Sequence, residues 1–546
     1  MVKILVREHG VYPWQGSLEE DGTIIRGVFY YDGKRYEHGI PEELRHIETE
    51  EEFQAKQKKL TGRYALICRG TNRTFFAVDR ISIYPLFYGL SEKNDMVISD
   101  SFALIEQETG AVCPDTEGML QFLSTQSTYG NRTLSKKIQT LMAGQYAVLN
   151  HETQELSVRD YDTHSHTESY PHDEQWLTQK HEEVLDDVFS RMIQELNGKK
   201  VILFLSGGYD SRLVALQLKK HGYSNVICVS FGKHKSRDFN VAKEVAAKLG
   251  FEWMSIEADP NAMQHLLDDE SKKHWLTQCS NGFRTPYLEA ILLRPYFERG
   301  ILPKDGVIIN GNSGDFIEGE QFCPNFTPGG SYHADDIVDA VLARHFTLSG
   351  EGLKNHKQHR NTIKTELHLD DHRTYSYFEC QELYEQINWR ERQSKYVVNS
   401  VWECEELHQM EWKLPLWDDA LVDYWLNVPI DERAHRKLYY KMVHADALPS
   451  ANVMTPYLLM MNTIKKWCFP LIRMAYPVKK MLGYLRNDSD YYICDRQTFS
   501  KILSYTRGFE TNTVTVVCYM VAQHLYSRYF GDVVKFAKEQ IKIGKR

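Results

Sequence analysis

The chain has 546 residues, of which 42% are hydrophobic and 25% are charged, and its formal net charge is −9 at pH 7. This length and composition are typical of a soluble globular protein with two or three domains, and the negative charge argues against a general nucleic-acid binder. No run approaches the roughly 18 apolar residues of a membrane-spanning helix, and the first residues lack the apolar core of a signal peptide. We therefore expect a cytoplasmic protein with no nucleic-acid partner.

The first 160 residues form the first expected domain. They carry short apolar runs of strand length, such as RYALIC, TFFAVD and QYAVLN, separated by polar turns, and this pattern is typical of a β-rich domain. Residues 161–180 are expected to be a linker, because the stretch DYDTHSHTESYPHDE is polar, contains a proline and shows no helical or strand periodicity. We interpret its His164, His166 and His172 as solvated linker residues in preference to metal ligands.

Residues 181–546 form the second expected domain, in which strands and helices alternate. A helix to about Asn197 precedes the apolar run Val201–Leu205, and further strands are predicted at 226–231 and 307–310. An apolar run without alternation is typical of a strand covered on both faces, as in the middle of a parallel sheet. The sequence thus predicts a doubly wound α/β sheet, whose ligands bind beyond the carboxyl ends of the strands.

Two of the predicted strand ends are polar and rich in glycine, SGGYDS at 206–211 and GNSGD at 311–315. Gly207 and Gly208 allow backbone N–H groups to approach an anion, and the following helix directs its positive end to the same place. Asp210 would repel a bare phosphate, so its presence favours Mg²⁺ between the carboxylate and the phosphates of a nucleotide.

A second acidic group, Asp315, ends the other loop, so two carboxylates from separate loops could hold magnesium. The alternative is a tight strand-to-helix turn with a capping aspartate, but the pattern S-G-G-x-D-S directly after a buried strand is more specific than a glycine pair. Neither G-x-x-x-x-G-K-[ST] nor G-x-G-x-x-G occurs in the chain, which weakens a kinase-like or dinucleotide-binding interpretation.

These stretches together resemble the asparagine synthetase family. LSGGYDSRL is similar to the pyrophosphate loop of ATP pyrophosphatases, which activate a substrate as its adenylate, and VSFGKHKSRDFNVAKEVAAKLGFEW, NGNSGDFIEG and RAHRKLYYKMVHADALP are similar to later segments of that family. GRYALICRGTNRTFFAVDRISIYPLFYG is similar to a class II glutaminase-type domain. The resemblance implies a degenerate, Ntn-hydrolase-like α+β sandwich followed by a doubly wound α/β ATP-pyrophosphatase domain with a helical C-terminal part.

The resemblance also implies which residues bind ATP and Mg²⁺. Asp210 and Asp315 inherit the role of magnesium ligands, and Lys437 inherits that of a family lysine that contacts the phosphates. For Lys437 a solvated basic face, shared with Arg436 and Lys441, stays open as an alternative. The residues expected to bind ATP and pyrophosphate are Leu205, Ser206, Gly207, Gly208, Asp210, Ser211, Ser230, Phe231, Gly232, Asn310 and Gly311.

Two positions depart from the family pattern. Val2 stands where the family's glutaminase has an N-terminal cysteine, and a valine methyl cannot act as a nucleophile, so we expect no glutamine hydrolysis. Asn312 stands where asparagine-forming members have a glutamate, and an amide can orient a group but cannot take up a proton. Either another base such as Glu318 or Asp238 serves beside Asn312 and Lys437, or the substrate is not aspartate.

The expected activity is that of an AMP-forming ligase, which adenylates a small-molecule or lipid-linked carboxylate and transfers free ammonia or an amine to it, in surface-polysaccharide or natural-product biosynthesis. An asparagine synthetase that uses ammonia and a non-catalytic scaffold stay open as alternatives. Residues 464–486 hold six basic residues and no acidic ones and could contact the inner face of a membrane, although a helix on the domain core is the favoured interpretation. A homodimer is a further expectation.

Overall fold

A computed structural model describes residues 2–445 except 9, 37, 111–112, 233–236, 258–274 and 349–356, and beyond residue 445 only 518, 521–524, 533, 535–536 and 539. The expected membrane contact at 464–486 lies outside the described residues. Among the helices that are described, none combines the length and the apolar character that crossing a membrane requires.

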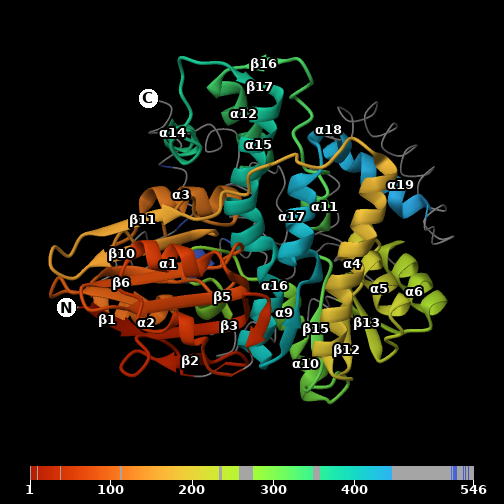
Figure 1. The fold of residues 1–546 in the computed structure, drawn as a ribbon, viewed down its shortest axis with the longest axis horizontal. Helices are drawn as coiled ribbons and strands as arrows, with labels where there is room; N and C mark the ends of the chain where they lie inside the picture. The colour runs from red at the N-terminus through yellow and green to blue at the C-terminus, as the bar shows by residue number, and fades with distance from the viewer. Residues whose placement is uncertain are drawn as a thin grey trace.

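The N-terminal domain contains two β-sheets (Figure 1). The side chains of its central strand β5 point alternately into two hydrophobic cores. Ala65 and Ile67 belong to one core, and Tyr64, Leu66 and Cys68 belong to the other. The seven-stranded sheet comprises, in the order of its strands, β11 (Leu156–Asp160), β10 (Gln145–Asn150), β6 (Arg73–Val78), β5 (Leu60–Arg69), β3 (Thr23–Tyr31) and β2 (Trp14–Ser17), with β4 (Lys34–Tyr36) paired to β3.

The four-stranded sheet of this domain has the order β1 (Val2–Leu5), β8 (Met96–Ser99), β7 (Phe87–Leu90) and β9 (Ile138–Thr140). The helical elements of the domain are η1 (Glu42–Leu44), α1 (Glu50–Gln57), α2 (Phe102–Thr109) and α3 (Thr116–Thr125). The β-rich character predicted from the short apolar runs is therefore confirmed.

The second domain is built on a five-stranded sheet of order β14-β13-β12-β15-β18, in which every pair is parallel. Leu203 of β12 lies opposite Cys228 of β13 on one side and Ile309 of β15 on the other. The chain thus leaves β12 in one direction and returns to its other side at β15, which makes the edge between these strands a topological switch point. The strands are β12 (Val201–Phe204), β13 (Val226–Gly232), β14 (Glu252–Glu257), β15 (Val307–Ile309) and β18 (Glu411–Lys413).

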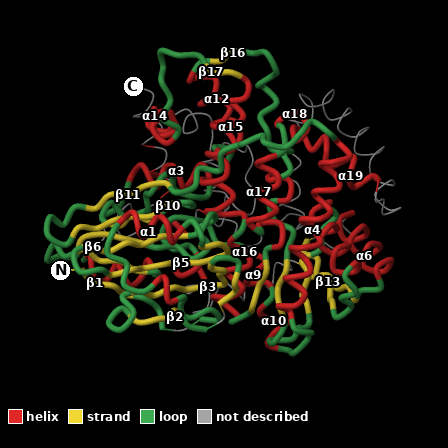
Figure 2. The backbone as a smooth tube through the Cα atoms, viewed as in Figure 1, coloured by secondary structure: helices red, strands yellow, loops and turns green. Residues whose placement is uncertain are grey.

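Helices surround this sheet and form a separate lobe above it, as Figures 1 and 2 show. Those near the sheet are α4 (Glu174–Leu196), α5 (Tyr209–Lys220), α6 (Arg237–Leu249), η2 (Trp275–Cys279), α9 (Leu288–Leu292), α10 (Arg294–Glu298), α11 (Gly314–Ile317), α16 (Asn399–His408), η4 (Pro415–Trp417), α17 (Asp419–Asn427), α18 (Ile430–Arg433), η5 (Ala434–Arg436) and α19 (Lys437–Ala445). The lobe contains α12 (Ala334–His345), α14 (Lys357–Glu366), α15 (Tyr377–Asn388), the π-helical segment η3 (Trp389–Val397) and the short strands β16 (Ser331–Tyr332) and β17 (Tyr375–Ser376). The predicted α/β fold class is confirmed.

The expected linker ends earlier than predicted, and one of its histidines is buried. Helix α4 already begins at Glu174, where the Asp173 side chain accepts a hydrogen bond from the Trp176 N–H, so residues 174–180 are helical. His164 is only 2% exposed and stacks between Phe316 and Trp389, with ring centroids 5.3 Å from each. The interpretation of this histidine as solvated was wrong, because its aromatic partners lie far along the chain and the local polar composition does not reveal them.

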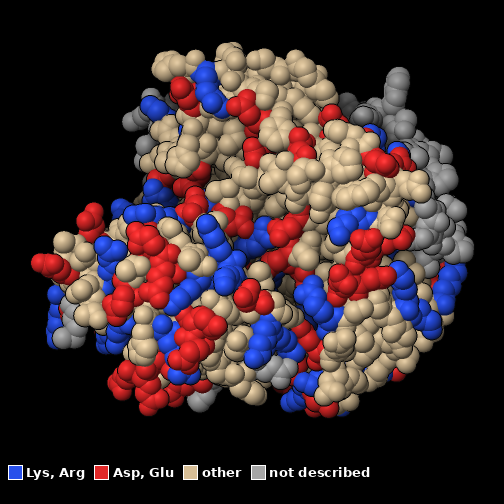
Figure 3. All heavy atoms as spheres, viewed as in Figure 1, with Lys and Arg blue, Asp and Glu red and all other residues tan. Residues whose placement is uncertain are grey.

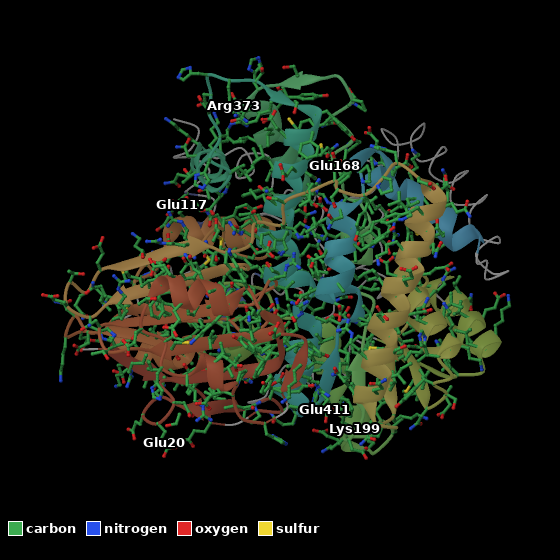
Figure 4. The ribbon with its side chains drawn as sticks, in the orientation of Figure 1. Glu20, Glu117, Glu168, Lys199, Arg373 and Glu411 are labelled. Atoms are coloured by element: carbon green, nitrogen blue, oxygen red, sulfur yellow. The ribbon has the colours of Figure 1, made fainter. Side chains whose placement is uncertain are left out.

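Buried ion pairs join the two domains. The Arg26 guanidinium lies 3.0 Å from a Glu405 carboxylate oxygen, and the Tyr84 hydroxyl donates to the other oxygen over 2.9 Å. Within the second domain, the partly exposed side chains of Lys199 and Glu411 form an ion pair, and both residues are labelled in Figure 4. On the face drawn in Figure 3, acidic and basic side chains alternate over the described part of the N-terminal domain.

Candidate active site

The SGGYDS loop connects β12 to α5 and is held by its own serines. The Ser206 N–H donates to Oγ of Ser211 over 3.0 Å, and Oγ of Ser206 accepts from the Gly208 N–H over 3.1 Å. Gly208 then caps α5, whose 12 residues direct the positive end of the helix toward the loop. The first N–H groups of a helix have no partner within it, so this arrangement favours an anion such as a phosphate.

The loop after β15 approaches the start of α5 closely, and two glycines allow this approach. A Cβ atom added to Gly311 would lie 2.5 Å from the Ser211 nitrogen, and one added to Gly314 would lie 2.6 Å from Cγ of Asp210. The Asp315 N–H can therefore donate to Oδ2 of Asp210 over 2.9 Å. The two aspartates that the sequence singled out thus lie together at the switch point of the sheet, close enough for their carboxylates to interact electrostatically.

A buried cation, Arg436, faces these carboxylates. Its guanidinium binds Asp210 and Glu318, with 2.8 Å between Nε and Oε2 of Glu318. Burial, opposed by Arg436 and reinforced by Asp315, raises the pKa of Asp210 to about 6. Burial likewise raises the pKa of Glu318 well above its ordinary value. Glu318, named above as a possible base, is thus a buried group paired with Arg436.

A strained turn delivers Arg436 to this position. His435 and Arg436 both have left-handed backbone conformations, with φ of 57° and 60°, and the His435 N–H donates to the Gly319 carbonyl over 2.9 Å. Two consecutive non-glycine residues in this region are energetically costly and persist only where their surroundings enforce them. Sequence reasoning missed Arg436 because neither residue is a glycine or asparagine that would announce such a turn.

Lys437, by contrast, does not join the acidic cluster. Its Nζ lies 2.9 Å from Oε2 of Glu432, and its side chain is 47% exposed. The structure therefore brings together Asp210 and Asp315 as predicted, and it places Arg436 beside them while Lys437, the first residue of α19, stays at the surface.

Asn312 is held by its own amide group. Its Nδ2 donates to the Val397 carbonyl over 2.6 Å and to Oγ of Ser400 over 3.0 Å, and Asn310 donates to the same serine hydroxyl over 3.1 Å. A carboxylate at position 312 could not donate these bonds. The asparagine thus holds the acidic loop against η3 and α16, a role that the spacing of the residues does not reveal.

The end of β13, Ser230–Gly232, which the sequence also predicts to bind ATP, lies beside the SGGYDS loop. Oγ of Ser230 donates to the Leu205 carbonyl over 2.6 Å, and the Phe231 ring packs on Phe204 with centroids 5.0 Å apart. A Cβ atom added to Gly207 would lie 2.5 Å from a carboxylate oxygen of Asp238. Gly232 ends β13, and residues 233–236 that follow it are not described.

The donor set fits magnesium and a nucleotide. Two carboxylates supply the hard oxygen ligands that Mg²⁺ prefers, and serine hydroxyls with helix N–H groups supply donors for phosphate oxygens. Within the described residues, no group of three or more histidine, cysteine or acidic side chains forms a complete metal cage. Mg²⁺ usually binds through one or two carboxylates together with substrate phosphates.

The N-terminal domain contains two cysteines, Cys68 and Cys113. Cys68 is buried within β5, and burial raises the pKa of its thiol to about 12, which makes it inert as a nucleophile. Val2 begins β1, where it lies opposite Met96 of β8. The eight cysteines that the structure describes are free thiols, and seven of them are buried.

Comparisons with known proteins match both domains. A glutamine amidotransferase domain model matches residues 48–162, and an asparagine synthase model matches residues 182–271. The second match includes the SGGYDS loop, and the first begins downstream of Val2. A search of curated proteins finds no match.

Two solved structures are similar in part. One is the NH3-dependent NAD synthetase from Campylobacter jejuni subsp. jejuni NCTC 11168 in complex with the nitrate ion, at 20% identity over 27% of this chain and 61% of that chain, with a TM-score of 0.19. The other is the glutamine phosphoribosylpyrophosphate (PRPP) amidotransferase from B. subtilis complexed with ADP and GMP, at 11% identity over 56% of this chain and 57% of that chain, with a TM-score of 0.18. The chain spans less than two thirds of either structure, and these two similarities carry no functional argument.

Proposed function

We propose that this chain is an AMP-forming, ATP-dependent ligase, which makes an amide from a carboxylate and ammonia or an amine. The proposal starts from the asparagine synthetase-family architecture that the two family models indicate. The observation that carries this proposal is the meeting of Asp210 and Asp315 at the switch point of the parallel sheet, beside a glycine-rich loop and a helix N-terminus. Ligands of doubly wound sheets bind at this edge.

The proposed reaction has two steps. An oxygen of the substrate carboxylate attacks the α-phosphorus of ATP, the bond to the β-phosphate oxygen breaks, and pyrophosphate leaves. Ammonia or an amine then attacks the acyl carbon, loses a proton, and displaces AMP as the amide forms. Pyrophosphate is a poor leaving group unless its developing negative charge is stabilised. The protein must therefore supply hydrogen-bond donors and positive charge around the phosphates.

The residues of the site suit these demands. Asp210 and Asp315 would hold Mg²⁺, which when bound neutralises phosphate charge. Ser206, Ser211 and the N–H groups at the start of α5 would bind the departing pyrophosphate. Lys437 would contribute positive charge if its half-exposed side chain left Glu432 for a bound nucleotide.

The amine is proposed to come from solution. The domain that resembles a glutaminase has a valine at the start of β1, and its strand cysteine carries a thiol whose pKa is raised to about 12 by burial. Neither group can attack glutamine at neutral pH. Ammonium or a free amine is therefore proposed as the direct nitrogen donor.

One observation favours a second candidate, a non-catalytic relative. Arg436 already neutralises Asp210, and it would have to share that carboxylate with a magnesium ion. A scaffold would keep the ion pair permanently and bind no nucleotide. The asparagine synthetase alternative is disfavoured by Asn312, because its amide is committed to Val397 and Ser400 and cannot take up a proton.

The test is pyrophosphate release from ATP and Mg²⁺ with ammonium and a panel of carboxylic acids. We expect release with acids other than aspartate. If aspartate gives pyrophosphate release and asparagine forms, the synthetase is favoured. If no acid gives release and calorimetry shows no ATP binding, the scaffold is favoured.

A further inference from the structure

A cavity of about 390 Å³ lies where η3 meets the C-terminal ends of α3 and α12. Its walls include Gln126 beyond α3, Arg344 and His345 from α12, and Arg392 and Tyr396 from η3. Cavities of this size can enclose part of a small metabolite. The N-terminal domain and the helical lobe therefore meet around this partly open cavity.

The cavity carries excess positive charge. Among the described residues neither Arg344 nor Arg392 has a carboxylate within ion-pair distance, whereas the one acidic residue of the wall, Glu391, is bound to Lys395 over 2.7 Å and accepts from the Gly130 N–H over 2.9 Å. Burial lowers the pKa of Arg392, and the neighbouring Arg344 lowers it further. Arg392 is partly buried, and Arg344 is exposed beside it. The two neighbouring guanidinium groups repel each other, and an anion bound between them would relieve this repulsion.

A neutral histidine lies in the same wall. His345 is buried, and burial together with Arg392 and Arg344 lowers its pKa well below the ordinary value. Its Nδ1 lies 2.5 Å from the Tyr129 hydroxyl, while its Nε2 is buried and has no hydrogen-bond partner among the residues that the structure describes. When the hydroxyl donates to Nδ1, the ring proton is on Nε2, and the ring beside the two arginines stays uncharged.

One side chain connects this cavity to the acidic loop. Gln321 donates from Nε2 to Oδ2 of Asp315 over 2.5 Å, and its Oε1 lies 3.4 Å from Nη1 of Arg392. The same segment η3 that lines the cavity also accepts from Asn312 through the Val397 carbonyl. The Gln321 amide thus lies between Asp315 and Arg392. An anion bound to Arg392 would be separated from the carboxylate of Asp315 by this one amide group.

We infer that the substrate acid is dianionic and longer than a four-carbon diacid, with one carboxylate for adenylation and a remote carboxylate or phosphate group that Arg344 and Arg392 bind in this cavity. The inference rests on the proposed function. Guanidinium forks bind both kinds of anion bidentately. The remote end would orient the acid, and its binding would lower KM without taking part in the chemistry.

The kinetic test measures pyrophosphate release with acids matched in length. The panel contains succinate, adipate, suberate, an ω-phosphono carboxylate of adipate length and the monoacid hexanoate. We expect the longer dianionic acids to have the lowest KM, and Arg392→Gln and Arg344→Gln to raise that KM at least tenfold with kcat changed less than threefold. Arg392→Lys should raise KM less than Arg392→Gln does. Comparing the KM of the phosphono acid with that of adipate shows which remote anion the cavity prefers.

The matched control is Arg360→Gln, which removes a guanidinium of the same lobe that is paired with Asp335 and Asp339 outside the cavity. It should leave every KM unchanged. Equal KM values for hexanoate and adipate, or a KM for adipate that neither cavity variant changes, would overturn the inference while leaving the ligase proposal intact.

A binding measurement separates the two proposals. Calorimetry with adipate and with inorganic phosphate, without ATP, should give heat for the wild-type chain and for Arg360→Gln, and at least tenfold weaker binding for Arg344→Gln, whose exposed position makes misfolding a small risk. If no acid releases pyrophosphate but this binding is lost in the variant, the anion site stands and the ligase proposal fails. Binding that is equal in wild type and variant refutes the anion site.

Discussion

The Asp315 N–H donates a hydrogen bond of 2.9 Å to Oδ2 of Asp210, so the first turn of α11 holds the carboxylate that begins α5. The other oxygen of Asp210 binds Arg436. Two loops that are 105 positions apart in sequence therefore share one acidic centre. Changes at Asp210 should affect the chemistry of the site, while changes at the glycines around it should affect its geometry.

Asp210→Asn should abolish pyrophosphate release. The amide keeps the size of the side chain but removes the charge that would bind Mg²⁺. The measurement is pyrophosphate release over a range of Mg²⁺ concentrations, with Asp371→Asn, an exposed carboxylate of the helical lobe, as the control that should behave like wild type. Full activity of the Asp210 variant would remove this residue from the metal site.

Gly311→Ala should separate the two loops. The added methyl would lie 2.5 Å from the Ser211 nitrogen and 2.7 Å from the Asp210 carbonyl carbon, and backbone atoms cannot yield as flexible side-chain ends do. Overpacking of this kind costs about 1–3 kcal/mol of stability, and we expect a larger proportional loss of activity because Asp210 and Asp315 move apart. Activity and thermal unfolding should be measured on the same preparations.

The control for this variant is Gly300→Ala, because a methyl there meets nothing within 4 Å and only the left-handed backbone, with φ of 67°, opposes it. That costs about 1–2 kcal/mol and should leave catalysis unchanged. If both variants lose activity equally, the close approach of the loops is not what matters.

Arg436→Gln and Lys437→Ala should differ in kind. Removing Arg436 leaves the buried Glu318 without its cation, and breaking a buried ion pair costs about 3–5 kcal/mol. Lys437 is half exposed, and surface changes usually stay within about 0.5 kcal/mol. Calorimetry should therefore show a lower unfolding temperature for the arginine variant only.

Activity of the lysine variant tests its assignment separately. Lys437→Ala should raise KM for ATP with unfolding unchanged, and an unaltered KM would show that the lysine belongs to a solvated basic face. Rescue of stability by Arg436→Lys would indicate that charge, more than the guanidinium fork, holds Glu318.

The sheet and its loops were predictable because their causes are local. Val201–Leu205 is apolar without alternation, so a strand covered on both faces follows from the residues themselves, and glycines directly after it indicate a tight turn. The meeting of Asp210 and Asp315 then follows from the adjacency of β12 and β15, which the rule for doubly wound sheets anticipates.

The contacts that were missed depend on residues far apart in sequence. Arg436 reaches Asp210 through a left-handed turn that no glycine marks, and His164 is buried by Phe316 and Trp389, which follow it by more than a hundred residues. The commitment of Asn312 to Val397 depends on how η3 packs on the acidic loop. Composition and spacing carry no signal of such tertiary contacts.

Acid should destabilise the protein partly through His181. This side chain is 4% exposed and lies between Tyr424 and Trp425, and burial lowers its pKa to about 3. Because the unfolded chain has a histidine of ordinary pKa near 6.5, it takes up a proton below that pH while the folded state does not. The stabilising contribution of neutral His181 is therefore complete above pH 6.5 and is lost progressively as the pH falls toward 3.

His181→Phe removes this titration and keeps an aromatic ring between Tyr424 and Trp425. Between pH 7 and pH 5 the free energy of unfolding should fall by about 2 kcal/mol more for the wild type than for the variant. In thermal unfolding, the midpoint of the wild type should therefore fall further over this pH range. His372→Gln, at an exposed position, should lose as much as wild type. An equal fall for wild type and His181→Phe would mean that acid sensitivity arises elsewhere, with buried His345, whose pKa is lowered in the same direction, as the next residue to replace.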